Sequence, residues 1–377
     1  MKKTLPSWVN KTHINPVISY NTDTFSFLKE KSKYVNWAAL SENPNSIDTL
    51  FKYIDRIVWC KLSRNRSPDV TKLLEYYANV RETYYYYYYY RERMMYYFGV
   101  GSNLDLYELS KNPSAVPFLE KHPKYIDWRG LSGNINAISI LEKNMDKVNW
   151  HELSGNINAI SILEKNLDKV DWCSVSWNIN AIPILEKNLD KVNWCNISHN
   201  INAISILENN LDKVQWCNIS SNMNAISILE KNLDKVYWDQ LSRNANAISI
   251  LEKNLDKVQW WNISCNINAI SIVEKNLDKV YWEQLSRNRN AISILEKNLD
   301  KIDWKQLSFN RNAISILEKN QDKIDWWAFS YNTGIFVYDY EYYKEKMDVH
   351  REELIKKVFS PRRLSYYLEM GYDFSDI

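Results

Sequence analysis

The sequence predicts an all-α fold, an elongated α-solenoid of repeats of about 22 residues, each with one three-turn helix and one short α- or 3₁₀-helix. Three observations predict this fold. Tryptophan recurs at a fixed interval, apolar residues within each unit follow a helical spacing, and asparagine and proline stand where helices should begin and end. The 377 residues would suggest two or three ordinary domains, but the repeat implies roughly fourteen thin layers instead.

The repeat is marked by a Trp every 22 residues. Its consensus is W-x-x-L/I/V-S-x-N-x-N-A-I-S-I-L-E-K-N-L-D-K-V-x, and positions in the repeat are counted below from this Trp as position 1. The interval is also found between Trp37 and Trp59, and divergent copies extend the pattern towards the N-terminus. The regular copies begin with Trp at 128, 150, 172, 194, 216, 238, 260, 282, 304 and 326.

The apolar residues of one unit lie on one helical face. Ile138, Leu141, Met145 and Val148 are spaced three, four and three residues apart. Trp150 then begins the short second helix, over residues 150–154. Such a unit cannot bury its apolar stripe alone, whereas stacked copies can. We expect the Trp to be the wedge between two helix rows, with its large apolar area dominating the core.

The divergent copies indicate the helix boundaries. Pro44 and Pro113 each follow an Asn, which predicts that the equivalent Asn134 is an N-cap followed by the first helical residue. Pro123 occupies the position of Met145 in the regular repeats. The main helix is therefore predicted over about 135–144, ending at an Asn that caps it or starts the next turn.

Interruptions of the repeat divide the chain into four regions. We predict divergent N-terminal repeats at 1–75, a Tyr-rich interruption or degenerate repeat at 76–105, a regular array at 106–332 and a C-terminal capping segment at 333–377. The second region contains a run of seven tyrosines and holds either a hidden repeat or a longer helix that protrudes from the stack. The last region should cover the apolar end of the final repeat.

Composition excludes several classes of function. Lys and Arg total 48 against 46 Asp and Glu, which argues against a protein devoted to neutralising nucleic acid. Only 7 residues are Gly, so phosphate-binding loops and nucleophile elbows are not expected. Near-identical layers offer no unique converging side chains, so we predict no enzyme, no catalytic residue, no metal site and no cofactor.

Targeting and cysteine signals predict an intracellular protein. The N-terminus has no apolar signal segment, and no stretch is long and apolar enough to span a membrane. The five cysteines do not form a disulfide framework or a zinc motif. Those at position 2 are interpreted as small apolar fillers: Cys60, Cys173, Cys195 and Cys217.

The repeat resembles that of a known group of proteins. The unit N-I-N-A-I-S-I-L-E-K-N-L-D-K-V-D-W is similar to the short Trp/Asn/Leu repeats of uncharacterised giant-virus proteins of the mimivirus type. The segment from Phe359 to Leu364 also resembles a tail common in those proteins. The usual Pro is replaced here by Ile, Leu or other residues in the regular repeats. The resemblance implies a viral origin, with a location in the host cytoplasm or viral factory, but no activity.

Comparison of the copies separates fixed from variable residues. Variation is concentrated at positions 2 and 3, between Ser and the first Asn (position 6), and between the two Asn (position 8). We expect these positions to stack into one edge of the solenoid, which is either a recognition surface or a drifting solvent edge. Aromatic residues, His and Arg, which carry binding energy at interfaces, favour recognition. The candidate partner-binding residues are Trp177, His199, Arg243, Trp261, Arg287, Arg289, Phe309, Arg311 and Tyr331.

The variable edge leads to a hypothesis of function and two alternatives. We expect a non-enzymatic scaffold that binds a protein partner, host or viral, along this edge. The first alternative is an RNA- or DNA-binding helical repeat that uses the Arg and aromatic residues of the later repeats. The second is a structural component of the virion or viral factory.

Overall fold

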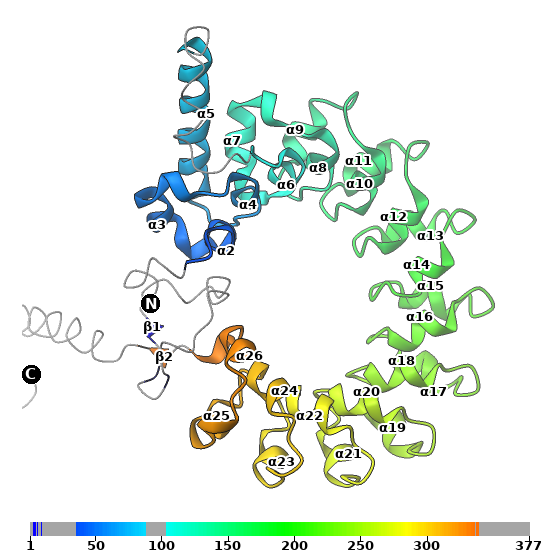
Figure 1. Cartoon of the computed structure of the whole chain (residues 1–377). Helices are drawn as coiled ribbons and strands as arrows, with labels where there is room; N and C mark the ends of the chain where they lie inside the picture. The colour runs from blue at the N-terminus through cyan, green and yellow to red at the C-terminus, as the bar shows by residue number, and fades with distance from the viewer. Residues whose placement is uncertain are drawn as a thin grey trace, which may run out of the picture.

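The computed structural model describes residues 3–4, 6, 9, 35–87, 103–335 and 337–338. Within these residues, short helices stack in two rows and the stack bends into an almost complete ring (Figure 1). Helices that begin at the repeat Trp, or at Leu106 in its place, form the inner row, and the helices that follow them form the outer row. The predicted α-solenoid with a 22-residue repeat is therefore confirmed.

The inner row contains thirteen helices in the described part of the chain, close to the number of layers predicted. Its members are α2 (Trp37–Glu42), α4 (Trp59–Leu62), α6 (Leu106–Lys111), α8 (Trp128–Ser132), α10 (Trp150–Gly155), α12 (Trp172–Trp177), α14 (Trp194–Ile197), α16 (Trp216–Ser221), α18 (Trp238–Arg243), α20 (Trp260–Cys265), α22 (Trp282–Arg287), α24 (Trp304–Phe309) and α26 (Trp326–Ser330). Successive inner helices pack against one another along the row.

The outer row alternates with the inner row along the chain. Its members are α3 (Ile47–Lys52), α5 (Val70–Tyr87), α7 (Val116–Lys121), α9 (Ile138–Glu142), α11 (Ile160–Lys165), α13 (Ile182–Glu186), α15 (Ile204–Glu208), α17 (Ile226–Glu230), α19 (Ile248–Lys253), α21 (Ile270–Glu274), α23 (Ile292–Glu296) and α25 (Ile314–Lys319). Single 3₁₀ turns are η3 (Pro44–Ser46), η4 (Ile54–Arg56), η6 (Pro113–Ala115), η7 (Pro123–Tyr125), η8 (Gln321–Lys323) and η9 (Thr333–Ile335).

The outer helix is shorter than the predicted three turns. α9 has 5 residues, about one and a half turns. Before it, the Asn134 Oδ1 accepts a hydrogen bond from the Asn136 backbone N–H at 3.0 Å, which folds residues 134–137 into a separate turn. After it, the Asn144 Nδ2 donates to the Ile140 carbonyl at 2.9 Å and caps the helix. The two Asn side chains thus replace the first and last helical turns. In the divergent repeats the prediction holds, because Asn43 caps η3 with Pro44 in its first turn.

Invariant polar residues join each layer to the preceding one. The Asn156 Nδ2 donates to the carbonyls of Ser132 and Asn134, both at 3.0 Å, and this Asn is almost fully buried. The Ser154 Oγ donates to the Trp150 carbonyl at 2.7 Å and accepts from the Asp171 N–H at 3.0 Å. The Asn bonds recur at position 7 of every repeat from Asn134 to Asn332. These bonds satisfy buried backbone groups that would otherwise be costly.

The repeat Trp does not dominate the core as predicted. In the regular repeats its side chain is only half-buried, whereas Leu153, Ala159 and Leu163 are completely buried. The Lys at position 20 lies over the indole, as the Lys169 Nζ does at 5.3 Å from the Trp150 ring centroid. The indole therefore covers the rim of the core and contacts a cation on its outer face.

The described start of the Tyr-rich region, residues 76–87, continues the outer helix α5, and residues 88–102 lie outside the described part of the chain. Residues Val70, Leu73 and Leu74 of α5 are buried in the stack, and the helix then protrudes from the ring (Figure 1). The Asn112 Nδ2 donates to the Ser63 carbonyl at 3.1 Å, across 49 residues where a regular pair is separated by 24. The ladder of hydrogen bonds from the Asn at position 7 to the preceding layer therefore connects the layers of α4 and α6 directly. The chain between these two layers is 25 residues longer than in a regular repeat. The predicted boundary at 75/76 falls inside α5.

A pair of two-residue strands joins the two ends of the described chain. β1 (Lys3–Thr4) pairs antiparallel with β2 (Val337–Tyr338), with Lys3 opposite Tyr338 and Thr4 opposite Val337. Val9 is buried in the hydrophobic core. In Figure 1 both strands lie in the gap of the ring between α2 and α26. Most of the divergent sequence before Trp37, and most of the predicted C-terminal cap, lie outside the described residues.

Candidate functional site

The variable side chains lie mainly on the inner row of helices. Positions 2, 3 and 6 belong to the inner helix, as His151, Glu152 and Gly155 do in α10, and position 8 lies on the turn that follows. These helices form the inner row of the ring (Figure 1), and their buried side is the one that carries positions 4 and 5. Position 2 is exposed in all ten regular repeats. We call the side chains at positions 2 and 6 of α8 to α26 the inner wall.

Two pairs of side chains at position 6 are in contact between successive layers. The Trp177 and His199 rings are stacked, with centroids 4.9 Å apart and an interplanar angle of 26°. The Trp177 side chain is 50% exposed, and the buried Nδ1 of His199 has no hydrogen-bond partner among the described residues. Further along, the Phe309 and Tyr331 centroids are 6.1 Å apart. The prediction that these residues stack on successive layers is confirmed for both pairs.

Two arginines flank a thiol at the same position of the repeat. Burial raises the pKa of the Cys265 thiol, and the charges of Arg243 and Arg287, in the layers before and after it, oppose this increase. The Arg243 Nε donates to the Asn262 Oδ1 at 2.8 Å, and its guanidinium carbon lies 5.4 Å from the Trp261 ring centroid. Position 6 of one layer therefore contacts positions 2 and 3 of the next.

The last layers hold an aromatic cluster that includes one residue not predicted. The Trp327 ring centroid is 5.9 Å from that of Phe309 and 5.1 Å from that of Tyr331, in both cases edge to face. The Arg287 guanidinium carbon lies 5.8 Å from the Phe309 centroid. Trp327 occupies position 2, the same position as Trp261, and this signal could have identified it from the sequence.

Position 8 lies on the rim of the ring beside the inner wall. Its backbone carbonyl accepts from the next repeat, as the Arg289 carbonyl does from the Asn312 Nδ2 at 3.0 Å. Its side chain is exposed at Arg289 and Arg311, and at most of the apolar residues that precede them. The predicted edge therefore comprises two adjoining surfaces, the inner wall and this rim.

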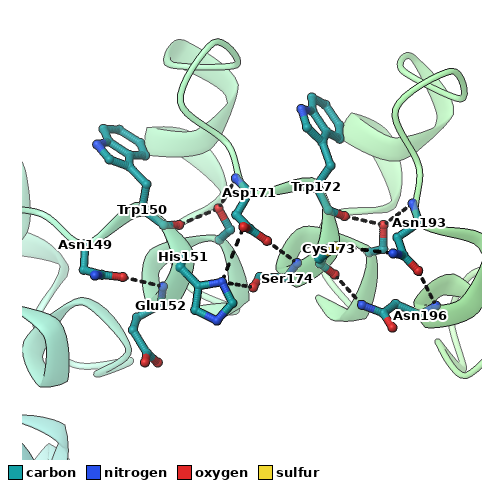
Figure 2. A network of polar contacts seen from close by, with 12 residues as sticks. Asn149, Trp150, His151, Glu152, Asp171, Trp172, Cys173, Ser174, Asn193 and Asn196 are labelled. Atoms are coloured by element: carbon teal, nitrogen blue, oxygen red, sulfur yellow. Dashed lines mark hydrogen bonds and ion pairs between the residues drawn. The ribbon is translucent and has the colours of Figure 1, made fainter.

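A Ser–His–Asp cluster on the inner wall has the wrong geometry for a nucleophile. The His151 Nδ1 lies 3.1 Å from the Ser174 Oγ and 3.4 Å from the Asp171 Oδ2, so both partners contact the same ring nitrogen (Figure 2). In a catalytic triad they contact different nitrogens. Burial alone would raise the pKa of Asp171, but hydrogen bonds from Ser174 and His151 lower it. The Asp171 Oδ1 accepts from the Ser174 backbone N–H at 2.7 Å, which identifies a helix N-cap.

The cysteines at position 2 of the regular repeats are not apolar fillers. Cys173, Cys195 and Cys217 are exposed on consecutive layers of the inner wall. The Asn218 Nδ2 contacts the carbonyl of Cys195 at 2.9 Å and its Sγ at 3.1 Å. The prediction failed because position 2 follows a half-buried Trp but points away from the core.

Comparison with known proteins identifies no family. No family model matches the chain, and no curated protein or solved structure is similar to it. Among the helices that the structure describes, none is long and apolar enough to cross a membrane. In the described ranges, no group of three or more His, Cys, Asp and Glu side chains is arranged to hold a metal ion.

Proposed function

We propose that the chain is a non-enzymatic scaffold that binds a protein partner, host or viral, on the inner wall and the adjoining rim. The supporting observation is where sequence variation lies. Positions 4 and 5 of the inner helix are buried in every regular repeat and hardly vary. The exposed position 2 and the exposed or partly exposed position 6 of the same helix differ from layer to layer. The backbone is the same in every layer, but the exposed side chains differ between layers. Such a surface suits recognition of one partner that has no internal repeat.

The contacts between variable residues add to this argument. Drift on a solvent edge would leave neighbouring layers unrelated. Instead, Trp177 stacks on His199, Arg243 covers Trp261, and Phe309 contacts Tyr331. Large aromatic side chains arranged in this way form preordered surfaces of the kind that carry binding energy. The proposed partner therefore contacts several successive layers at once.

Affinity capture with matched variants tests the proposal. A tagged chain carrying Trp177→Ala, Arg287→Ala and Phe309→Ala should lose the proteins captured by the wild type. The control carries three alanines at exposed outer-row residues, Lys187, Lys275 and Glu318. Equal thermal stability of the two variants would show that the fold is retained. If both variants captured the same proteins as the wild type, the inner wall would not be the binding surface.

Binding of single-stranded nucleic acid is the second candidate. The pairs Arg243–Trp261 and Arg287–Phe309 combine a cation with an aromatic ring, as surfaces that stack bases do. A salt titration with an unstructured RNA decides between the two. Nucleic-acid binding predicts an affinity that falls steeply with salt, and no binding at low salt would eliminate this candidate.

A further inference from the structure

Three exposed arginines of the last layers lie on the inner wall and the adjoining rim. Arg287, Arg289 and Arg311 are all exposed, and none forms an ion pair with another described residue. Phe309, Trp327 and Tyr331 lie among them. We call these six residues the Arg-aromatic patch. Because the whole chain has a net charge of only +2, this local excess of cations is not a general property of the surface.

The carboxylates of these layers are mostly held elsewhere. The Asp303 Oδ1 accepts from the Gln306 N–H at 2.9 Å, and the Asp325 Oδ1 accepts from the Ala328 N–H at 2.8 Å. Both are N-caps, so they lie at the opposite ends of α24 and α26 from Phe309 and Tyr331. Glu283 is the exposed acid on the inner face of these layers. The acids of α22, α24 and α26 thus lie at the N-terminal ends of these helices, whereas Arg287, Phe309 and Tyr331 lie at their C-terminal ends.

The stacked turns bring the three arginines onto adjoining layers. The Asn312 Nδ2 donates to the Arg289 carbonyl at 3.0 Å. A Cβ built on Gly334 would lie 2.3 Å from the Arg311 carbonyl oxygen, so the next turn packs directly on the Arg311 backbone. Arg287 and Arg289 flank the buried Asn288. These rigid turns fix the backbone positions of the arginines and reduce the entropy lost when they bind a partner.

We propose that the Arg-aromatic patch binds an acidic peptide segment, a deduction that rests on the proposed function and specifies its partner. Carboxylates of the segment pair with Arg287, Arg289 and Arg311, because the planar guanidinium matches a carboxylate in two parallel hydrogen bonds. An apolar side chain of the segment packs on Trp327 and Tyr331, which are 50% and 40% exposed.

The aromatic geometry favours a peptide over a nucleic acid. Bases stack on flat, open ring faces. Here the rings pack on each other at interplanar angles of 39° to 89°, and one face of Phe309 is covered by Arg287. The exposed Glu283, at the other end of α22 from Arg287, would also repel a phosphate backbone that runs along this helix. A peptide with intermittent carboxylates can avoid this acid.

The probe for the test is a fluorescein-labelled peptide of three Glu-Glu-Leu-Phe units, titrated with the full chain and followed by anisotropy. We expect binding that weakens with salt. Arg287→Glu should weaken binding about tenfold or more, whereas Lys275→Glu, an equal charge change on the outer row, should change it less than about twofold. Trp327→Ala should weaken binding of this peptide but not of a Glu-Glu-Gly-Gly peptide.

Three outcomes would overturn the inference. They are no binding of the acidic peptide, equal binding by the Arg287→Glu and Lys275→Glu variants, and tighter binding of a 12-nucleotide uridine oligomer than of the acidic peptide. Failure of the acidic-peptide inference can be distinguished from failure of the proposed function. If captured partners still depend on Trp177 while the acidic peptide does not bind, the inner wall is a binding surface and only the assignment of this patch is wrong.

Discussion

Asn222 illustrates how an invariant side chain joins two layers. It is 3% exposed, its Nδ2 donates to the carbonyls of Ser198 and Asn200 at 3.2 Å each, and its Oδ1 accepts from the Asn224 N–H at 3.0 Å. Only an amide of this length supplies donor and acceptor together. The same demand in every layer explains why position 7 does not vary.

Replacing Asn222 with Asp should therefore be costly. The change keeps the shape but removes the donor and buries a carboxylate against two carbonyl oxygens. We expect a loss of about 3 kcal/mol in the free energy of unfolding. Asn224→Asp is the matched control, because the Asn224 Nδ2 donates to the Ile201 carbonyl at an exposed site. Loss of this hydrogen bond should lower the free energy of unfolding by about 1 kcal/mol. Urea unfolding measures the free energy of unfolding of both variants. Equal losses would contradict the claim that the buried hydrogen bonds of Asn222 contribute more to stability than the exposed one of Asn224.

Cysteine reactivity provides a second test at this scale. Cys173, Cys195 and Cys217 are exposed, whereas Cys265 is half-buried with a pKa raised by burial and donates to the Gln284 Oε1 at 3.2 Å. Because the thiolate is the reactive form, Cys265 should be alkylated more slowly. Pulsed alkylation at pH 8 with mass spectrometry measures each rate. The denatured chain is the control, in which the difference should vanish; equal rates in the folded chain would show that the thiols share one environment.

At the scale of elements, α5 shows how an insertion is accommodated. Its first two turns replace an outer helix, with Val70, Leu73 and Leu74 buried as the apolar residues of regular repeats are. The same two turns also contact the end of α7, since the Glu75 Oε2 lies 2.9 Å from the Nε2 of His122, the C-cap of α7. The stack therefore tolerates 25 extra residues because they leave the ladder between layers intact.

The Glu75 contact predicts a pH dependence. The hydrogen bond with His122 lowers the pKa of Glu75, and this outweighs burial, which raises it. The contribution to stability is therefore present above the unfolded pKa of about 4.3 and is lost as pH falls through the lower folded value. The side chain is 30% exposed, so solvent limits the effect to less than about 1 kcal/mol.

Glu75→Gln should reduce the dependence of stability on pH between about 5 and 3. Thermal melts across this range measure the change. Glu120→Gln, at an exposed site on the same outer row, is the control and should leave the pH dependence unchanged. Identical profiles for the wild type and the Glu75 variant would show that the contact contributes nothing measurable.

At the scale of the whole molecule, the strand pair β1–β2 connects Lys3 with Tyr338 and Thr4 with Val337, residues from the two ends of the described chain. Two-residue strands are weak alone. Burial of Val9 adds about 2 kcal/mol to this connection. Together they hold the two ends of the solenoid in one ring.

Deleting residues 1–9 should therefore open the ring. Spin labels at the exposed Asp48 and Thr333, near the two ends of the array, should report a longer and broader distance distribution. The control is a pair at Asp168 and Lys231 within the array, whose distance should not change. An unchanged distance between the end labels would show that the solenoid maintains its curvature without the strands.

The sequence by itself determined the repeat, its two helices and its fixed residues. These properties are local, because capping, helical spacing and the demand for an amide at position 7 act within one or two units. The extent of the interruption could not be predicted, since only the contact between Ser63 and Asn112 shows that no layer intervenes. The length of the outer helix was also wrong, because Asn134 and Asn144 bond to nearby backbone in place of helical turns.

The tertiary structure alone decided which row lies inside the ring. The stack is curved because the spacing between layers differs slightly between the two rows and these differences add up along the array. A single repeat therefore does not determine the curvature. It places positions 2 and 6 on the inner wall and exposes the thiols expected in the core. Packing also brings Trp327 of α26 against Phe309 of α24 in the preceding layer, a contact that depends on the distance between the two helices. The repeat fixed which residues could vary, and the curvature decided what those residues face.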